Sequence, residues 1–247
     1  MILLLTGCIK PNGMTMTALL NQEEREKQYV NAINFYLSNT TYPIVFTDNS
    51  GIDISYRFVD AIESGRMEYL TFRGNLDKTR GKGYGECEII EYALNNSRII
   101  LSHSDNRIAK ITGRLIVKNI TNIVRFHTLL LPQKATICAI NSDLSFPDTR
   151  FIIASKDLFR TFLKTKESIN DSKGHYFEHA FCDTIKEDKD HSFFPFLLMP
   201  QIEGVSGSTG ATYVTRSNSF AFVIKYARFA ISQKCRFNKL IHNYDCS

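Results

Sequence analysis

The chain has 247 residues, of which 43% are hydrophobic and 22% charged, and its net charge is +5 at pH 7. This length allows one large core, and the composition excludes a disordered chain. The mild positive charge is too small to indicate a nucleic-acid partner. The 6 cysteines have no CxxC spacing, which favours reduced thiols and a cytoplasmic protein over a zinc site or a disulfide scaffold.

Apolar runs and amphipathic segments alternate in the first half of the chain. Short apolar runs predict strands at Ile2–Leu5, Ile44–Thr47 and Met67–Phe72, and a further strand that ends at Thr112-Gly113-Arg114. Apolar residues at helical spacing predict helices at Glu23–Leu37, Ser55–Glu63 and Tyr84–Leu94. Strands separated by helices indicate an α/β fold with a mostly parallel central sheet flanked by helices.

Polar or glycine-rich turns follow the predicted strands. These turns are Thr6-Gly7, Asp48-Asn49-Ser50-Gly51, Arg73-Gly74-Asn75 and Thr112-Gly113-Arg114. Because ligands bind beyond the carboxyl ends of parallel strands, we expect the four turns to line one ligand-binding rim.

The second half of the chain is less regular. It predicts strands at Thr136–Ile140 and Phe151–Ala154, helices at Lys156–Lys164, Tyr176–Ile185 and Ser219–Ile241, and a Gly/Ser-rich loop at Glu203–Thr212.

Several segments carry a resemblance: LLLTG and IVFTDNSG at strand ends, a glycine-led helix, then KITGR, DTRFIIASKDLF and YFEHAF. Their order resembles GT-A type bacterial glycosyltransferases that build capsule, lipopolysaccharide or other surface glycans. The resemblance implies a Rossmann-like catalytic domain at 1–212, with a nucleotide-binding half at 1–120 and an acceptor-side half at 121–212, and a C-terminal helix at 213–247. It also implies a nucleotide-sugar donor and a glycan or lipid-linked glycan acceptor.

Thr112-Gly113-Arg114 lies where that family keeps an acidic DXD motif, whose carboxylates hold Mg²⁺ or Mn²⁺ against the donor diphosphate. The nearby acids form no such pair: Asp105, Asp143 and Asp148. We therefore expect transfer without a DXD-bound metal or another cofactor, with a divalent ion as the alternative. Lys110 and Arg114 then supply the positive charge, because a guanidinium matches phosphate oxygens. The alternative is an ordinary solvated pair.

The resemblance assigns the remaining donor contacts to the same rim. The donor-binding candidates are Thr6, Gly7, Asp48, Asn49, Ser50, Lys82, Lys110, Gly113 and Arg114. Gly81, Gly83 and Gly85 precede or begin a predicted helix, whose N-terminus is a natural anion site. A plain flexible start to that helix is the alternative.

Glu178 and His179 are the catalytic candidates. An inverting sugar transfer needs a general base for the acceptor hydroxyl, and the resemblance implies such a base on a helix after the central sheet. Phe177 and Phe181 mark the buried face of the predicted helix, and Glu178 lies beside it. The alternative is an exposed charged pair.

The predicted C-terminal helix is rich in aromatic and basic residues: Phe220, Phe222, Tyr226, Phe229 and Phe237, with Lys225, Arg228, Lys234, Arg236 and Lys239. Such a helix suits peripheral contact with the inner face of the cytoplasmic membrane, or packing on the core or a second subunit. Two other functions stay open: a nucleotidyl- or phosphotransferase on a related fold, and a non-catalytic nucleic-acid or membrane-binding module.

Overall fold

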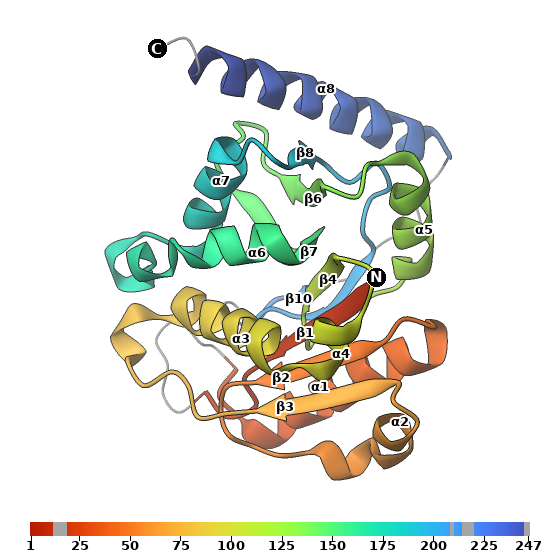
Figure 1. The fold of residues 1–247 in the computed structure, drawn as a ribbon, viewed down its shortest axis with the longest axis vertical. Coiled ribbons are helices and arrows are strands. Elements are labelled where there is room, and N and C mark those ends of the chain that lie inside the picture. The colour runs from red at the N-terminus through yellow and green to blue at the C-terminus, as the bar shows by residue number, and fades with distance from the viewer. Residues whose placement is uncertain (12–18, 208–209, 214–219, 245–247) are drawn as a thin grey trace.

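The computed structural model describes residues 1–11, 19–207, 210–213 and 220–244. Its centre is a seven-stranded sheet in the order β3-β2-β1-β4-β7-β6-β8 (Figure 1). The strands are β1 (Ile2–Gly7), β2 (Ile44–Asp48), β3 (Met67–Thr71), β4 (Arg107–Thr112), β6 (Ala135–Ile140), β7 (Pro147–Ser155) and β8 (Ser192–Phe194). Neighbouring strands are parallel except at β7, which is antiparallel to both β4 and β6. The predicted α/β fold with a mostly parallel sheet is confirmed.

Consecutive residues of the central strands are buried on opposite faces of the sheet. In β1, Leu3 and Leu5 belong to one core and Ile2 and Leu4 to the other, and all four are fully buried. A strand covered on both faces needs apolar side chains at every position, which explains the continuous apolar run in the sequence.

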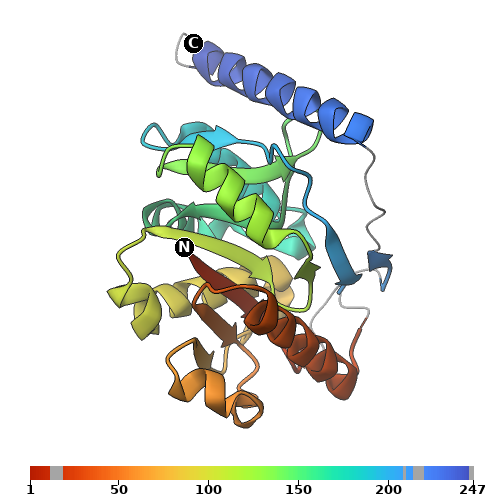
Figure 2. The same ribbon diagram turned by 90° about the vertical axis from the view of Figure 1, so that its right-hand side faces the viewer.

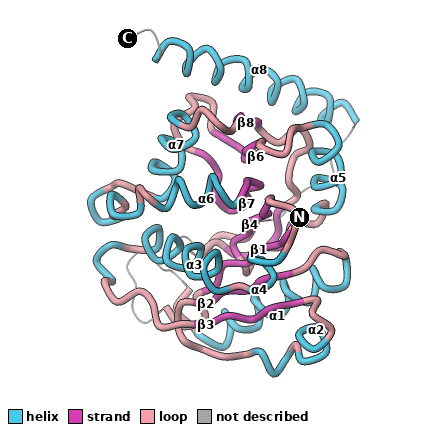
Figure 3. The backbone as a smooth tube through the Cα atoms, viewed as in Figure 1, coloured by secondary structure: helices cyan, strands magenta, loops and turns pink. Residues whose placement is uncertain are grey.

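Helices supply the cover on each face (Figures 2 and 3). On one face lie α1 (Gln22–Asn39) and α5 (Ile120–Leu130), and on the other α3 (Lys82–Asn96), α6 (Lys156–Leu163) and α7 (Phe177–Glu187). Four of these five helices agree with the predicted segments apart from their ends. The fifth, α5, is not predicted, although Ile120, Ile123 and Val124 are buried at helical spacing.

Two short regions differ from the sequence prediction. The predicted helix Ser55–Glu63 is divided into η1 (Ser55–Arg57) and α2 (Val59–Glu63), because Phe58 leaves the helical conformation and its ring is buried in the core. The apolar segment after α3 forms α4 (Arg98–Ser102), whose first turn is capped by the Ser97 side chain.

A second, three-stranded sheet has the order β10-β9-β5 and was not expected from the sequence. It consists of β5 (Ile116–Val117), β9 (Ile202–Val205) and β10 (Thr212–Tyr213). The predicted loop Glu203–Thr212 therefore includes strand residues at both ends, and its Ser208 and Thr209 lie outside the described residues. The hairpin between β9 and β10 lies next to Arg114, because β9 pairs with β5 and β5 begins just beyond the end of β4.

The helix α8 (Phe220–Tyr244) lies along the outer edge of the molecule beside β8 (Figure 1). Its inner face contributes Ala230, Gln233 and Phe237, which are buried. In the described part of the chain, no helix combines the length and apolarity that a membrane crossing requires. Residues 214–219 and 245–247 of the predicted C-terminal segment lie outside the described residues.

Candidate functional site

The predicted turns meet at one rim of the sheet and are bonded to one another. The Gly113 N–H donates to the Thr6 carbonyl at 2.8 Å, and the Asn49 N–H donates to the Gly7 carbonyl at 3.1 Å. A Cβ at position 113 would lie 2.8 Å from the Thr6 carbonyl oxygen, so only glycine lets the two strand ends approach this closely.

Two cavities with shared lining residues open along this rim. The larger, here called the main cavity, has a volume of about 410 Å³ and lies between the end of β4, α3, α7, β7 and the β9–β10 hairpin. The smaller, called the strand-end cavity, has a volume of about 100 Å³ and includes Thr6 and Gly7. Their shared wall consists of Lys82, Glu86, Thr112, Arg114 and Gly207.

Arg114 is the central cation of this wall. It is only 7% exposed, and its Nη1 donates to the Gln28 side chain at 3.0 Å and to the Val205 carbonyl at 3.1 Å. Nε is buried without a partner, and Nη2 has no hydrogen bond to any described residue. No ion pair to Arg114 occurs among the described side chains. The guanidinium is therefore fixed by two hydrogen bonds, and Arg114 lines both cavities.

Lys110 does not line either cavity, which revises its expected contact with donor phosphates. Its side chain is fully buried beneath the main cavity, on the face of β4 that α3 and α7 cover. Nζ forms an ion pair with Glu86 and donates to the Thr149 carbonyl at 2.7 Å. Its charge is thus already paired inside the protein, and its two contacts link Glu86 to Thr149.

Glu178 lines the main cavity at the start of α7. Thr149 Oγ1 donates to Glu178 Oε1 at 2.7 Å and fixes the carboxylate. Burial raises the pKa of Glu178, the Thr149 hydrogen bond acts in the opposite direction, and the nearby Glu86 charge raises it further. A carboxylate with this environment holds a proton more strongly than an exposed one, as a general base requires.

His179 does not face the main cavity, so it is not in position to act as the second catalytic group. It is absent from the lining of the main cavity, and its Nδ1 accepts the Tyr176 backbone N–H at 3.2 Å. The ring also packs against Phe146, with ring centroids 5.3 Å apart. His179 therefore stabilises the first turn of α7 and supports an aromatic neighbour, while Glu178 alone of the predicted pair faces the cavity.

The glycine-rich start of α3 is occupied by an internal anion. Asp171 Oδ2 accepts the Gly83 N–H at 3.1 Å, and Asp171 is only 6% exposed. A Cβ at Gly81 or Gly83 would lie 2.5 and 2.8 Å from Asp171 atoms, which explains both glycines by close packing. The helix N-terminus that the sequence offered to a phosphate thus already holds a carboxylate. Lys82, which follows Gly81, lines both cavities, and burial lowers its pKa while Asp171 raises it.

The residues at the end of β2 differ in position: Asp48 is buried, whereas Asn49 and Ser50 line cavities. Asp48 is fully buried and lines none of the described cavities; its carboxylate accepts the backbone N–H groups of Ile9 and Ser50 at 2.7 and 2.8 Å. Its expected contact with the donor is therefore revised to a structural role. Asn49 lines the strand-end cavity, and Asn49 and Ser50 line a neighbouring cavity of about 580 Å³.

The described residues contain no group of three or more His, Cys, Asp or Glu side chains that fits a metal ion. The acids near the predicted DXD position are engaged elsewhere: Asp105 with Arg107, Asp148 with Arg150, and Asp143 with Ser145. The absence of a DXD-bound metal stays a prediction.

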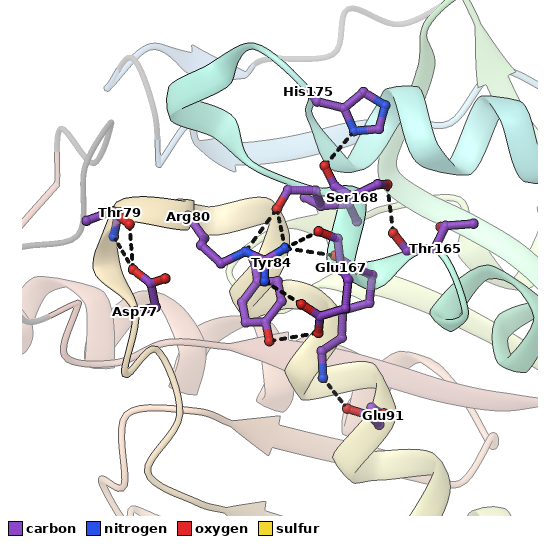
Figure 4. Close-up of polar contacts among 11 residues, drawn as sticks. Asp77, Thr79, Arg80, Tyr84, Glu91, Thr165, Glu167, Ser168 and His175 are labelled. Carbon is purple, nitrogen blue, oxygen red and sulfur yellow. Dashed lines mark hydrogen bonds and ion pairs between the residues drawn. The ribbon is translucent and has the colours of Figure 1, made fainter.

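Arg80 holds the segment between α6 and α7 against the start of α3 (Figure 4). Its Nη1 pairs with Glu167 at 2.6 Å, and Tyr84 Oη donates to the same carboxylate at 3.3 Å. The Arg80 guanidinium stacks over the Tyr84 ring at 3.9 Å. These contacts fix the segment that carries Asp171 and leads into Tyr176. Glu86, Thr149 and Asp171 are among the cavity-lining residues that the sequence did not indicate.

No protein-family model and no curated protein sequence matches the chain. Among solved structures, it is similar to mouse xyloside xylosyltransferase 1 in its apo form, with 11% identity, a TM-score of 0.42 and coverage of 78% of this chain and 83% of that one. Core-mannan synthase A from Aspergillus fumigatus, in its Mn/GDP form, has 8% identity, a TM-score of 0.45 and coverage of 92% and 82%. HddC from Yersinia pseudotuberculosis has 10% identity, a TM-score of 0.41 and coverage of 83% and 93%. At this level of similarity, a functional conclusion rests on the residues of the site itself.

Proposed function

We propose that the protein transfers a sugar from a nucleotide-sugar donor to a glycan acceptor. The observation that carries the proposal is the position of Arg114, a fixed cation without an acidic partner among the described residues, on the wall between the two cavities. The strand-end cavity suits the nucleotide, because its lining includes the turns after β1 and β2. The main cavity suits the two sugars, because Glu178 faces it.

In the proposed reaction, the acceptor hydroxyl attacks the anomeric carbon while the bond from that carbon to the donor phosphate breaks. Glu178 takes the proton of the hydroxyl, and the configuration at the anomeric carbon inverts. Arg114 stabilises the negative charge that develops on the departing phosphate, in the position where a metal ion would otherwise act. Lys82 adds positive charge to the same wall.

Thermal-shift measurements with UDP, GDP and CMP test the proposal, each with Mn²⁺ and with chelator. We expect one nucleotide to raise the unfolding temperature in the presence of chelator. Arg114→Ala should weaken that nucleotide's binding by about 1–3 kcal/mol, the contribution of a charge-assisted hydrogen bond. Arg57→Ala is the matched control, because Arg57 is an exposed arginine of η1 outside the cavities.

The outcomes of this experiment separate the competing functions. A shift that disappears with chelator would contradict metal-independent binding and would favour either the divalent-ion alternative or a metal-dependent nucleotidyl- or phosphotransferase. If no nucleotide or nucleotide sugar stabilises the protein, the proposed transfer is wrong.

We further propose that α8 brings the enzyme to an anionic membrane and so to a lipid-linked surface glycan. Residues 220–244 contain no Asp or Glu and five Lys or Arg residues, four of which are exposed: Lys225, Arg228, Arg236 and Lys239. Beside them, Phe222, Phe229 and Ile231 are 39%, 46% and 55% exposed. Exposed apolar groups next to basic ones suit the boundary between headgroups and acyl chains.

Co-sedimentation with phosphatidylcholine vesicles, with and without phosphatidylglycerol, tests this contact. Alanine at the four exposed basic positions of α8 should weaken binding to the anionic vesicles on the order of 1,000-fold, since each cation contributes about 1 kcal/mol. A control variant replaces four exposed cations outside α8, namely Lys27, Arg98, Lys134 and Lys164, and should bind as the wild type does. Equal loss in both variants would contradict a specific role for α8.

A further inference from the structure

Aromatic rings gather at one edge of the main cavity. Phe146 and Tyr176 both line the cavity, and their ring centroids lie 6.5 Å apart at an angle of 76°. His179 packs against both rings, with centroid distances of 5.3 and 5.4 Å, and His175 stacks on His179 at 5.8 Å. We call Phe146, Tyr176, His179 and His175 the aromatic edge.

The aromatic edge is not part of either hydrophobic core. Phe146 is 38% exposed, although full burial of a phenylalanine side chain contributes about 1.5–3 kcal/mol to stability. It follows Ser145 in the turn before β7, where Asn141 Oδ1 accepts both the Ser145 and the Phe146 N–H at 3.0 Å. The backbone of the turn is therefore fixed while its phenyl ring stays accessible to the cavity.

The chemistry next to the rings is that of a hydroxyl-bearing ligand. Glu178 lies two residues after Tyr176 and faces the same cavity. On the cavity wall, Arg150 pairs with Asp148 at 2.5 Å and stacks over the Tyr213 ring at 4.4 Å. A pyranose ring has an apolar C–H face that packs on the negative face of an aromatic ring, and hydroxyls around its perimeter that reach charged groups. A nucleotide phosphate has no such apolar face.

We propose that the aromatic edge is the acceptor subsite and binds a pyranose ring of the acceptor glycan, with the C–H face of the sugar on Phe146 and the edge of the sugar against Tyr176, whose ring lies at 76° to that of Phe146. The inference rests on the proposed glycosyl transfer and adds the place where the acceptor glycan binds and the side chains that hold it. A ring stacked on this edge presents its perimeter hydroxyls to the Glu178 carboxylate. His179 acts as a positioning residue, because its ring contacts both stacking residues and not the cavity.

Saturation-transfer difference NMR with methyl pyranosides of glucose, galactose and mannose tests the subsite without a donor. At least one probe should receive saturation mainly at the C–H protons of one ring face. Phe146→Ala and Tyr176→Ala should each weaken its binding about 3- to 10-fold. Phe146→Tyr should keep the signal, whereas Phe146→Leu, which keeps apolar area but has no aromatic face, should weaken it as Phe146→Ala does. Tyr56→Ala is the control, because Tyr56 is 64% exposed and lies outside the cavities.

Three results would overturn the proposal. The first is that the wild type saturates no pyranoside, and the second is that Phe146→Leu and Phe146→Tyr give equal signals. The third is a nucleotide thermal shift that disappears in Phe146→Ala, because this would assign the Phe146 ring to the donor base. Each is distinguishable from failure of the proposed function. If a pyranoside binds the aromatic edge but no nucleotide stabilises the protein, the subsite is supported and the proposed transfer is wrong. If a nucleotide stabilises the protein but no pyranoside binds, only the donor site is supported.

Discussion

Lys110 and Glu86 form an ion pair beneath the main cavity, and this pair joins the donor side of the site to its catalytic side. Glu86 also accepts the Thr6 hydroxyl at 3.0 Å, so it reaches the end of β1. Lys110 donates to the Thr149 carbonyl, and the Thr149 hydroxyl holds Glu178. A continuous polar chain therefore runs under the cavity floor from the proposed nucleotide contact to the proposed base.

Removing one partner of this ion pair should destabilise the protein more than removing both. Lys110→Met leaves Glu86 unpaired, and loss of one partner of a buried pair costs about 3–5 kcal/mol. We expect the lower part of that range, because the Glu86 side chain is 25% exposed to the cavity. The double variant Lys110→Met with Glu86→Gln should recover part of the loss. Urea unfolding of the four proteins of this cycle measures the coupling.

The pair Lys118–Glu203 provides the comparison for this cycle. It is also a lysine–glutamate pair, with a separation of 2.9 Å, but its side chains are 52% and 31% exposed. The same cycle there should give less than about 1 kcal/mol. Equal coupling energies in the two pairs would show that burial of Lys110 adds nothing to the interaction.

Gly207→Ala should impair nucleotide binding without unfolding the protein. A Cβ at position 207 would lie 2.3 Å from Arg114 Nη2, so the guanidinium must move away from the wall between the cavities. We expect a loss of nucleotide-induced stabilisation close to that of Arg114→Ala, with little change in the unfolding temperature of the free protein.

Gly65→Ala is the opposite case and serves as control. Gly65 has a φ of +71° and no atom within 4 Å of its would-be Cβ, so the substitution strains the backbone away from the site. It should lower stability by about 1 kcal/mol and leave nucleotide binding unchanged. If both glycine variants weaken nucleotide binding equally, the contact between Gly207 and Arg114 is not the cause.

The position of Arg114 follows from the sequence, whereas the burial of Lys110 does not. A strand that ends at Thr112 in a parallel sheet must place the next residues at the ligand rim. This rule depends on the end of the strand alone and not on which helices pack against it. Lys110 lies two residues earlier in the same strand, and its burial depends on α3 and α7 covering that face. The partner of the Gly81–Gly83 turn, Asp171, is 88 residues away from Gly83 along the chain. Contacts of that separation, the reversed β7 and the unpredicted α5 arise from tertiary packing rather than from local pattern.

Asp171→Ala should uncover an anion site at the N-terminus of α3. Loss of the carboxylate leaves the Gly83 N–H without its acceptor, which should cost about 0.5–2 kcal/mol. Millimolar sulfate should restore part of this stability in Asp171→Ala and less in Asp171→Asn, which keeps an acceptor oxygen. Asp77→Ala is the control, because Asp77 caps the exposed turn η2. Thermal shifts with and without sulfate measure the difference, and equal effects of sulfate on all variants would contradict an internal anion at α3.

Glu178→Gln should abolish transfer and stabilise the folded protein at neutral pH. Burial raises the pKa of Glu178 above its usual 4.5, so the folded protein binds this proton more strongly than the unfolded chain does. The ionised carboxylate therefore lowers stability above the folded-state pKa, and the penalty disappears as the pH falls below the unfolded value. Glutamine removes this penalty and keeps an oxygen for Thr149. The gain in unfolding temperature should be about 1–3 °C near pH 7.5, since 1 kcal/mol corresponds to about 2–4 °C at this size, and should vanish near pH 4.

The same substitution, Glu178→Gln, should lower transfer activity although it raises stability. A base must be ionised to accept the acceptor proton, so transfer by the wild type should rise with pH through the raised pKa of Glu178. Glu178→Gln should lose about 10²–10⁴-fold in kcat and retain its nucleotide-induced thermal shift. Asp183→Asn is the matched control, because Asp183 is an exposed acid of the same helix. Unchanged transfer in Glu178→Gln would remove this carboxylate from the reaction, and a stability gain that persists at pH 4 would show that ionisation is not its source.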